Sequence, residues 1–143
     1  MYILGINAYH GGASACLTEN GKLIAAAEEE RFKRIKYWAG FPVEAIRYCL
    51  AEAGITAYDL DHIGISRKPS ANLLKKILFT LSRRPSFRLV RNRLANAARV
   101  RDLRTVLVEG LGLQSESLKA EFHQVEHHRA HMASAFFVSP FQE

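Results

Sequence analysis

Residues 2–27 read YILGINAYHGGASACLTENGKLIAAA, a series of short apolar segments separated by turn-forming residues. We expect three β-strands, over residues 2–8, 13–18 and 23–27. The pair Gly11-Gly12 supplies the backbone freedom of a turn, and Asn20-Gly21 is typical of a tight hairpin. Because both connections are short, the chain is predicted to begin as an antiparallel meander of three strands.

The rest of the chain alternates helices and strands. Pro42 is predicted to open a helix that Gly54 ends, with apolar residues at helical spacing between them. Short strands are expected over residues 60–66 and 122–126, with helices between them and a last helix after the second. This order predicts an α/β fold, the N-terminal half of an actin/sugar-kinase-like (ribonuclease H-like) fold, in which parallel strands extend the meander and helices are inserted. A generic α/β sandwich is the alternative.

Length and composition fit one globular domain. The chain has 143 residues, of which 48% are hydrophobic, and this is enough for a core. Cys16 and Cys49 lie among apolar residues and are interpreted as reduced core residues. The N-terminus opens directly into a strand pattern, and no apolar run is long enough for a membrane span. We therefore expect a cytoplasmic protein without a membrane partner.

The positive charge is concentrated in one segment. Residues 67–113 contain twelve basic and two acidic residues, a net charge of +10, whereas the remainder has eight basic and twelve acidic residues, a net charge of −4. This basic helical insertion is interpreted chiefly as the solvated face of amphipathic helices. A role in substrate choice or subunit contact stays open. Nucleic-acid binding is less favoured, because only Phe79 and Phe87 offer aromatic rings for stacking there.

Three of the six histidines lie in the stretch EHHRAH, residues 126–131. On a helix, His127 and His131 stand on one face and can hold a single divalent metal ion, whereas His128 is turned about 100° away. Residues 132–137 are small or apolar, which predicts a buried helix whose histidines need partners. A solvated, merely polar helix start is the alternative.

Three segments, in this order, resemble the nodulation and antibiotic O-carbamoyltransferases. They are LGINAYHGGASACL (residues 4–17), AAAEEERFKRIK followed by FP (25–36 and 41–42), and EHHRAHMASAF continuing to SPF (126–136 and 139–141). That family is related to the universal tRNA threonylcarbamoyltransferases, which share a paired-histidine metal site. The resemblance implies that a carbamoyl group, activated as carbamoyl-adenylate from ATP and carbamoyl phosphate, is transferred to a hydroxyl of a small-molecule or sugar acceptor.

The resemblance also implies roles for the histidines. The metal ligands map onto His127 and His131, and the ion would be iron, zinc or manganese, which two imidazoles do not distinguish. His10 matches the family's histidine in the first turn, and we interpret it as a general base on the acceptor hydroxyl or a donor to the carbamoyl oxygen. A surface turn histidine is the alternative. His128 is a candidate oxyanion-stabilising group.

Two further groups are candidate binding residues. Gly11 and Gly12 would let the backbone approach a bound nucleotide or substrate closely. The expected substrate-binding residues are Glu30, Arg31, Arg34 and Lys36. A buried pair between Glu30 and Arg31 would order the loop beside the acceptor, and the other two cations would meet phosphate or acceptor. A solvated strand end with exposed charges is the alternative.

Members of the resembled family continue past the SPF segment with the second half of the fold and an activating domain. We interpret residues 1–143 as the N-terminal half of the carbamoyltransferase domain, inactive alone, whose partner is a C-terminal half that supplies an aspartate ligand. Apolar surface at residues 133–137 would then favour self-association. The alternatives are a tRNA threonylcarbamoyltransferase relative, or a nucleic-acid or protein-binding module built on the basic segment.

Overall fold

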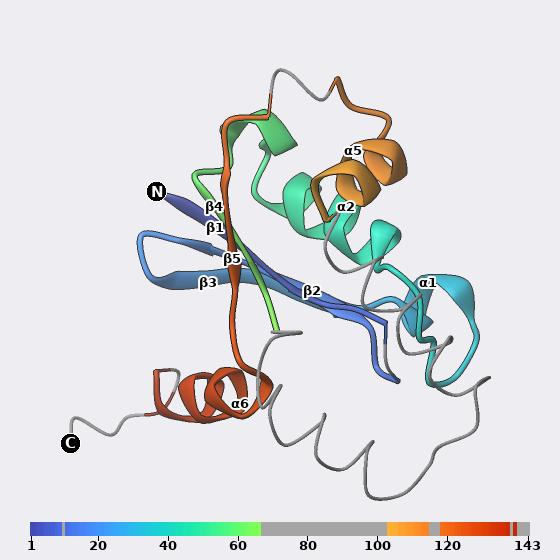
Figure 1. Cartoon of the computed structure of the whole chain (residues 1–143), viewed down its shortest axis with the longest axis vertical. Coiled ribbons are helices and arrows are strands. Elements are labelled where there is room, and N and C mark those ends of the chain that lie inside the picture. Colours follow the sequence, from blue (N-terminus) through green and yellow to red (C-terminus); the bar gives the residue numbers. More distant parts are fainter. Residues whose placement is uncertain (10, 67–102, 115–117, 138, 140–143) are drawn as a thin grey trace, which may run out of the picture.

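The computed structural model describes residues 1–9, 11–66, 103–114, 118–137 and 139. Its centre is a five-stranded sheet with the strand order β3-β2-β1-β4-β5 (Figure 1). The strands are β1 (Tyr2–Asn7), β2 (Ser14–Glu19), β3 (Lys22–Glu28), β4 (His62–Ile65) and β5 (Glu121–Gln124). The helices are α1 (Glu30–Lys33), α2 (Val43–Glu52), α5 (Leu103–Leu111) and α6 (His127–Phe136), with a 3-10 turn over Ala57–Asp59.

The sheet combines both strand directions. Strands β1, β2 and β3 pair antiparallel in sequence order, whereas β4 runs parallel to β1 and β5 runs parallel to β4. Asn20 and Gly21 both have positive φ, 50° and 83°, as the tight hairpin between β2 and β3 requires. The expected α/β fold, an antiparallel meander extended by parallel strands, is confirmed.

One face of the sheet carries the hydrophobic core, and α2 and α5 cover it (Figure 1). Alternate residues of each strand point to this face because the side chains of a strand alternate. The fully buried residues include Leu4, Leu17 and Ile63 from the strands, Ile46 from α2 and Leu107 from α5.

The sequence analysis interpreted both cysteines as core residues, but only Cys49 belongs to the hydrophobic core. Cys49 of α2 is completely buried, and Cys16 of β2 is half-buried. Gly5 of β1 lies opposite Cys16, and a Cβ atom on this glycine would stand 2.7 Å from the cysteine sulfur. A side chain at position 5 would therefore have to displace the Cys16 sulfur.

A buried glutamate joins β3 to α2. Glu29 is completely buried, and its carboxylate accepts hydrogen bonds from the backbone nitrogens of Ala45, at 2.8 Å, and Glu44, at 3.3 Å. These donors belong to the first turn of α2, which has Pro42 at its cap position and no side-chain cap of its own. Glu29 therefore satisfies helix N–H groups that would otherwise be left buried without acceptors.

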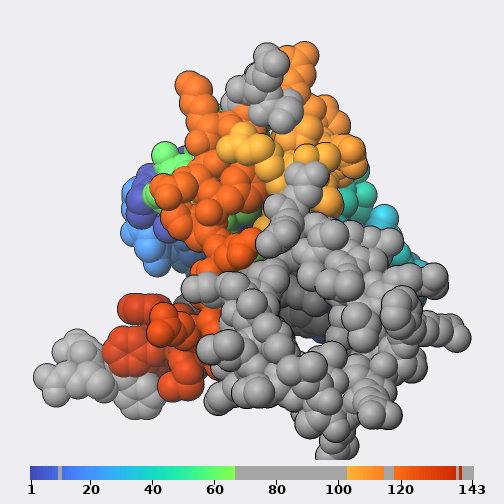
Figure 2. All heavy atoms as spheres, viewed as in Figure 1, coloured from blue at the N-terminus to red at the C-terminus, as the bar shows by residue number. Residues whose placement is uncertain are grey.

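Helix α6 is exposed, whereas its apolar content alone predicted burial; exposed apolar surface at residues 133–137 was expected only for a chain without a C-terminal half. None of its residues is buried, and Met132 and Phe137 expose 73% and 79% of their surface. The helix lies beyond the end of β5, and its atoms lie at the lower left of the view (Figures 1 and 2). Apolar content does not bury a helix unless another element faces it, and no element among the described residues covers these two side chains.

The predicted basic insertion is described only in its last part. Residues 67–102 lie outside the described residues, whereas α5 is described and buries Leu103, Leu107 and Val108 in the core. The end of the segment is therefore a core helix and not only a solvated face. None of the described helices is long and apolar enough to cross a membrane.

Candidate active site

A large cavity opens on the sheet face opposite α2 and α5, between the sheet and α6. Its volume is about 1220 Å³, and residues of β1, β2, β4 and α6 contribute to its lining. Four residues that the sequence analysis selected line this one cavity: Gly11, Arg31, His127 and His131. They come from the turn after β1, from α1 and from α6, which are far apart in the sequence.

The two α6 histidines face each other at the cavity wall. The Nε2 atoms of His127 and His131 are 3.1 Å apart, and their rings are nearly perpendicular, at 87°. The four-residue spacing places both side chains on one face of the helix. Two ligand nitrogens bound to one ion at about 2.1 Å lie roughly 3.0–3.4 Å apart, so the separation of the pair matches that of two ligands on one divalent ion.

The start of α6 is capped by its own glutamate. Glu126 accepts hydrogen bonds from the backbone nitrogen of Arg129, at 3.0 Å, and from Nδ1 of His128, at 2.8 Å. These two hydrogen bonds lower the pKa of Glu126 to about 2, and the bond from His128 has the larger effect. The His128 ring touches the His127 ring edge-on, at 5.8 Å between centroids, but 88% of its side chain is exposed and it does not line the cavity.

The glycine turn after β1 is tied to two strands. His10 lies outside the described residues, whereas Gly11 lines the cavity and Gly12 has a φ of 80°. The Asn7 side chain donates to the carbonyl of Gly12, at 2.9 Å, and accepts from the Ser66 hydroxyl, at 2.8 Å. Asn7 and Ser66 both line the cavity, although the sequence analysis did not select them. The available signal was a single amide inside an otherwise apolar strand.

The charged residues after β3 are divided between the cavity and solvent. Arg31 lines the cavity and is exposed, whereas Glu30 accepts from the backbone nitrogen of Tyr37, at 3.2 Å, and does not line it. Arg34 and Lys36 are exposed and also lie outside the lining. The expected buried Glu30–Arg31 pair is not formed, because the buried carboxylate of this segment is that of Glu29.

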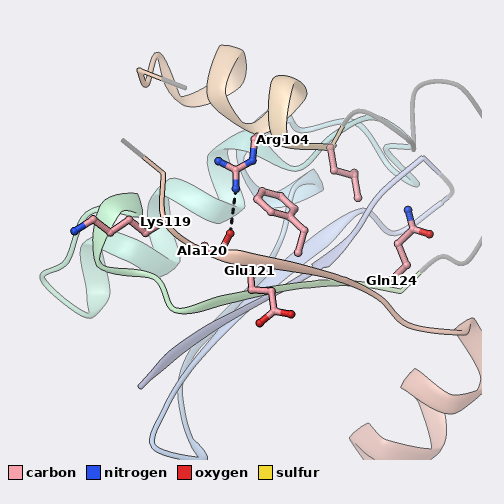
Figure 3. A pocket seen from close by; sticks show the side chains of 7 residues that line it. Arg104, Lys119, Ala120, Glu121 and Gln124 are labelled. Atoms are coloured by element: carbon pink, nitrogen blue, oxygen red, sulfur yellow. Dashed lines mark hydrogen bonds between the residues drawn. The ribbon is translucent and has the colours of Figure 1, made fainter. Parts of the chain in front are cut away.

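A second cavity, of about 550 Å³, lies between α5 and β5 (Figure 3). The guanidinium of Arg104 donates to the carbonyls of Leu118, at 2.7 Å, and Ala120, at 3.3 Å. It also lies 5.1 Å from the ring centre of Phe122. These contacts hold the segment before β5 against α5, so we interpret Arg104 as a structural residue.

Comparisons with known proteins identify one family and several relatives of this chain. A family model described as carbamoyltransferase N-terminus matches residues 2–143. The chain is 38% identical to the uncharacterized protein sll1178 of Synechocystis sp., over 99% of this chain and 24% of that protein. It is 33% identical to the nodulation protein NolNO of Sinorhizobium fredii, over 94% of this chain and 18% of that protein.

A search of solved structures finds YeaZ from Pseudomonas aeruginosa, with a TM-score of 0.49 and 15% identity, covering 94% of this chain and 50% of that chain. The chain spans less than a quarter of the length of sll1178 and of NolNO.

Proposed function

Because the chain belongs to the carbamoyltransferase N-terminus family, whose model matches residues 2–143, we propose that it is the N-terminal part of a metal-dependent O-carbamoyltransferase. The reaction transfers a carbamoyl group from carbamoyl-adenylate to a hydroxyl of a small-molecule or sugar acceptor. ATP and carbamoyl phosphate are the co-substrates. The rest of a longer polypeptide supplies further metal ligands and the second wall of the site.

The observation that carries this proposal is the composition of the large cavity. The cavity brings the imidazoles of His127 and His131 together with Gly11 and Arg31, from three segments that resemble the family motifs. A hollow of about 1220 Å³ has room for a nucleotide-sized ligand, since ligand sites commonly measure about 300–1000 Å³.

The described side chains suggest a division of roles. His127 and His131 hold a divalent ion, and such an ion supplies Lewis acidity toward a substrate oxygen. Arg31 offers a guanidinium to the phosphate of the adenylate. Asn7 holds the turn at Gly12 in place, so that the backbone beside the ligand keeps its conformation. His10 is proposed as the base that takes the proton of the acceptor hydroxyl.

Metal analysis of the longer protein tests the ligand pair. We expect His127→Ala and His131→Ala each to remove about one equivalent of bound metal, because one imidazole alone holds the ion poorly. His128→Ala is the matched control, since this neighbouring histidine faces Glu126 and should leave the metal content unchanged. Unchanged metal content in both ligand variants would contradict the metal assignment.

Carbamoyl transfer tests the base. His10→Ala should keep the metal and reduce transfer by roughly 100-fold or more, the usual contribution of a positioned base. If this variant retains both metal and transfer, His10 has no catalytic role. A full-length protein that carries the metal but carbamoylates no hydroxyl acceptor would contradict the proposed reaction.

A further inference from the structure

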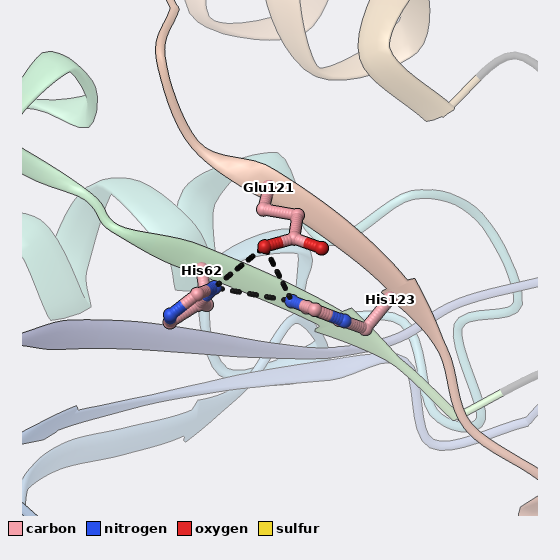
Figure 4. A group of neighbouring side chains, drawn as sticks. All are labelled: His62, Glu121 and His123. Atoms are coloured by element: carbon pink, nitrogen blue, oxygen red, sulfur yellow. Dashed lines mark hydrogen bonds and ion pairs between the residues drawn. The ribbon is translucent and has the colours of Figure 1, made fainter.

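A second group of potential ligands lies on strands β4 and β5. Nδ1 of His62 and Nε2 of His123 are 3.1 Å apart, and Oε2 of Glu121 lies 3.7 Å and 4.0 Å from them (Figure 4). All three ligand atoms lie within 4.8 Å of one another. We propose that these residues form a binding site for a divalent transition-metal ion, separate from the α6 histidine pair.

The strand register explains how the three side chains meet. His62 pairs with Glu121 in the parallel β4–β5 ladder, and His123 is two residues further along β5. Residues two apart on a strand point to the same face, so all three share the face opposite the core residues Ile63 and Ile65. The ligand set is therefore fixed by backbone pairing, and only side-chain rotation is left free.

The ligand set matches one chemical class of ion. Two imidazoles and one carboxylate favour ions such as zinc, cobalt or nickel, whereas magnesium and calcium prefer oxygen ligands alone. The imidazole nitrogens already lie at the separation of two ligands on one ion. The Glu121 side chain is 70% exposed, so it can close the remaining gap of less than about 1 Å by rotation.

The group does not belong to the large cavity. Neither His62, Glu121 nor His123 is among its lining residues, whereas His127 and His131 are. The β4–β5 group lies on the sheet, and the histidine pair lies on the helix that follows β5 (Figure 1). An ion on the sheet would link edge strand β5 to β4 through side chains, in addition to the backbone ladder.

Zinc titration of the 143-residue chain in a His127→Ala/His131→Ala background tests the proposal, because the α6 pair is then removed. We expect about one zinc ion per chain. Adding His123→Ala or Glu121→Gln should weaken binding at least tenfold, since even residues that only support a ligand contribute about 10–100-fold. Adding His128→Ala instead is the matched control and should change nothing.

If the variants with two or three substitutions fail to fold, a spectroscopic measurement on the wild-type chain tests the same site. In the wild-type chain with ¹⁵N-labelled histidine, zinc should shift Nδ1 of His62 and Nε2 of His123 and leave the opposite nitrogen of each ring protonated. Absence of stoichiometric zinc in the folded double variant, equal affinity after the added substitutions, or unshifted His62 and His123 signals would each overturn the site. Loss of the α6 pair's metal does not affect this outcome, so the two proposals fail separately.

Discussion

Helices α2 and α6 have the same length, ten residues, and opposite environments. Helix α2 buries four residues against the sheet, whereas α6 buries none. A glutamate caps each helix: Glu29 reaches α2 from the end of β3 and is buried, and Glu126 caps α6 from its own sequence. The comparison separates a helix that stabilises the fold from a helix that lines the cavity with two histidines.

The largest expected difference between the helices is in their packing. Ile46→Ala in α2 should lower the free energy of unfolding by about 2–5 kcal/mol, because it leaves a hole in a fully buried position. Met132→Ala in α6 should change it by about 0.5 kcal/mol or less, since this side chain is 73% exposed. Urea unfolding of both variants measures the difference, and comparable losses would remove the distinction between the helices.

The next largest effect concerns the buried cap. Glu29→Ala should lower the free energy of unfolding by about 2–3 kcal/mol, because two backbone N–H groups of α2 lose their acceptor in a site closed to water. Glu28→Ala, at the exposed neighbouring position, is the matched control and should cost about 0.5 kcal/mol or less. If both substitutions cost the same, the remote cap does not stabilise α2.

The smallest expected effect is a loss of stability at alkaline pH, which arises from the Cys49 thiol in α2. Burial is the main cause that raises the pKa of Cys49 from 9.0 to about 11, and the charge of the nearby Cys16 is the second. Below pH 9 the thiol is protonated in both states, whereas between pH 9 and 11 only the unfolded chain ionises. The free energy of unfolding should therefore fall by about 1 kcal/mol between pH 8 and 10 from this group alone.

Cys49→Ala checks the origin of that decline. Urea unfolding at several alkaline pH values should give a shallower decline for this variant than for the wild type. Part of the slope remains in the variant, because burial also raises the pKa of Cys16. Parallel curves for the two proteins would show that Cys49 ionises equally in the folded and unfolded chain.

Local sequence patterns predicted most of the fold. The strands of the meander and the hairpin at Asn20-Gly21 follow from alternation and turn chemistry, which act between near neighbours. The helix between Pro42 and Gly54 follows from the same local signals. The exposure of α6 did not follow from its apolar residues, because apolar content does not show which element will face a helix; it was expected only from the interpretation of the chain as one half of a domain.

The residues that the sequence analysis did not select are brought into place by contacts between distant segments. The sequence does not distinguish the three successive glutamates, residues 28–30. Only the position of α2 determines that Glu29 is the buried one. The meeting of His62 with His123 depends on the register of parallel strands, which no short segment encodes. By contrast, the His127–His131 pair was predictable, because helical spacing alone brings the two rings together.

Both α6 imidazoles come from a single helix, which would affect how the proposed metal centre is assembled. The 3.1 Å separation depends on the helical repeat and not on where α6 rests against the sheet. Movement of the whole helix therefore carries the pair as one chelating unit with constant spacing. Such a unit would hold the proposed ion before ligands from elsewhere are added, so binding of the ion need not wait for them.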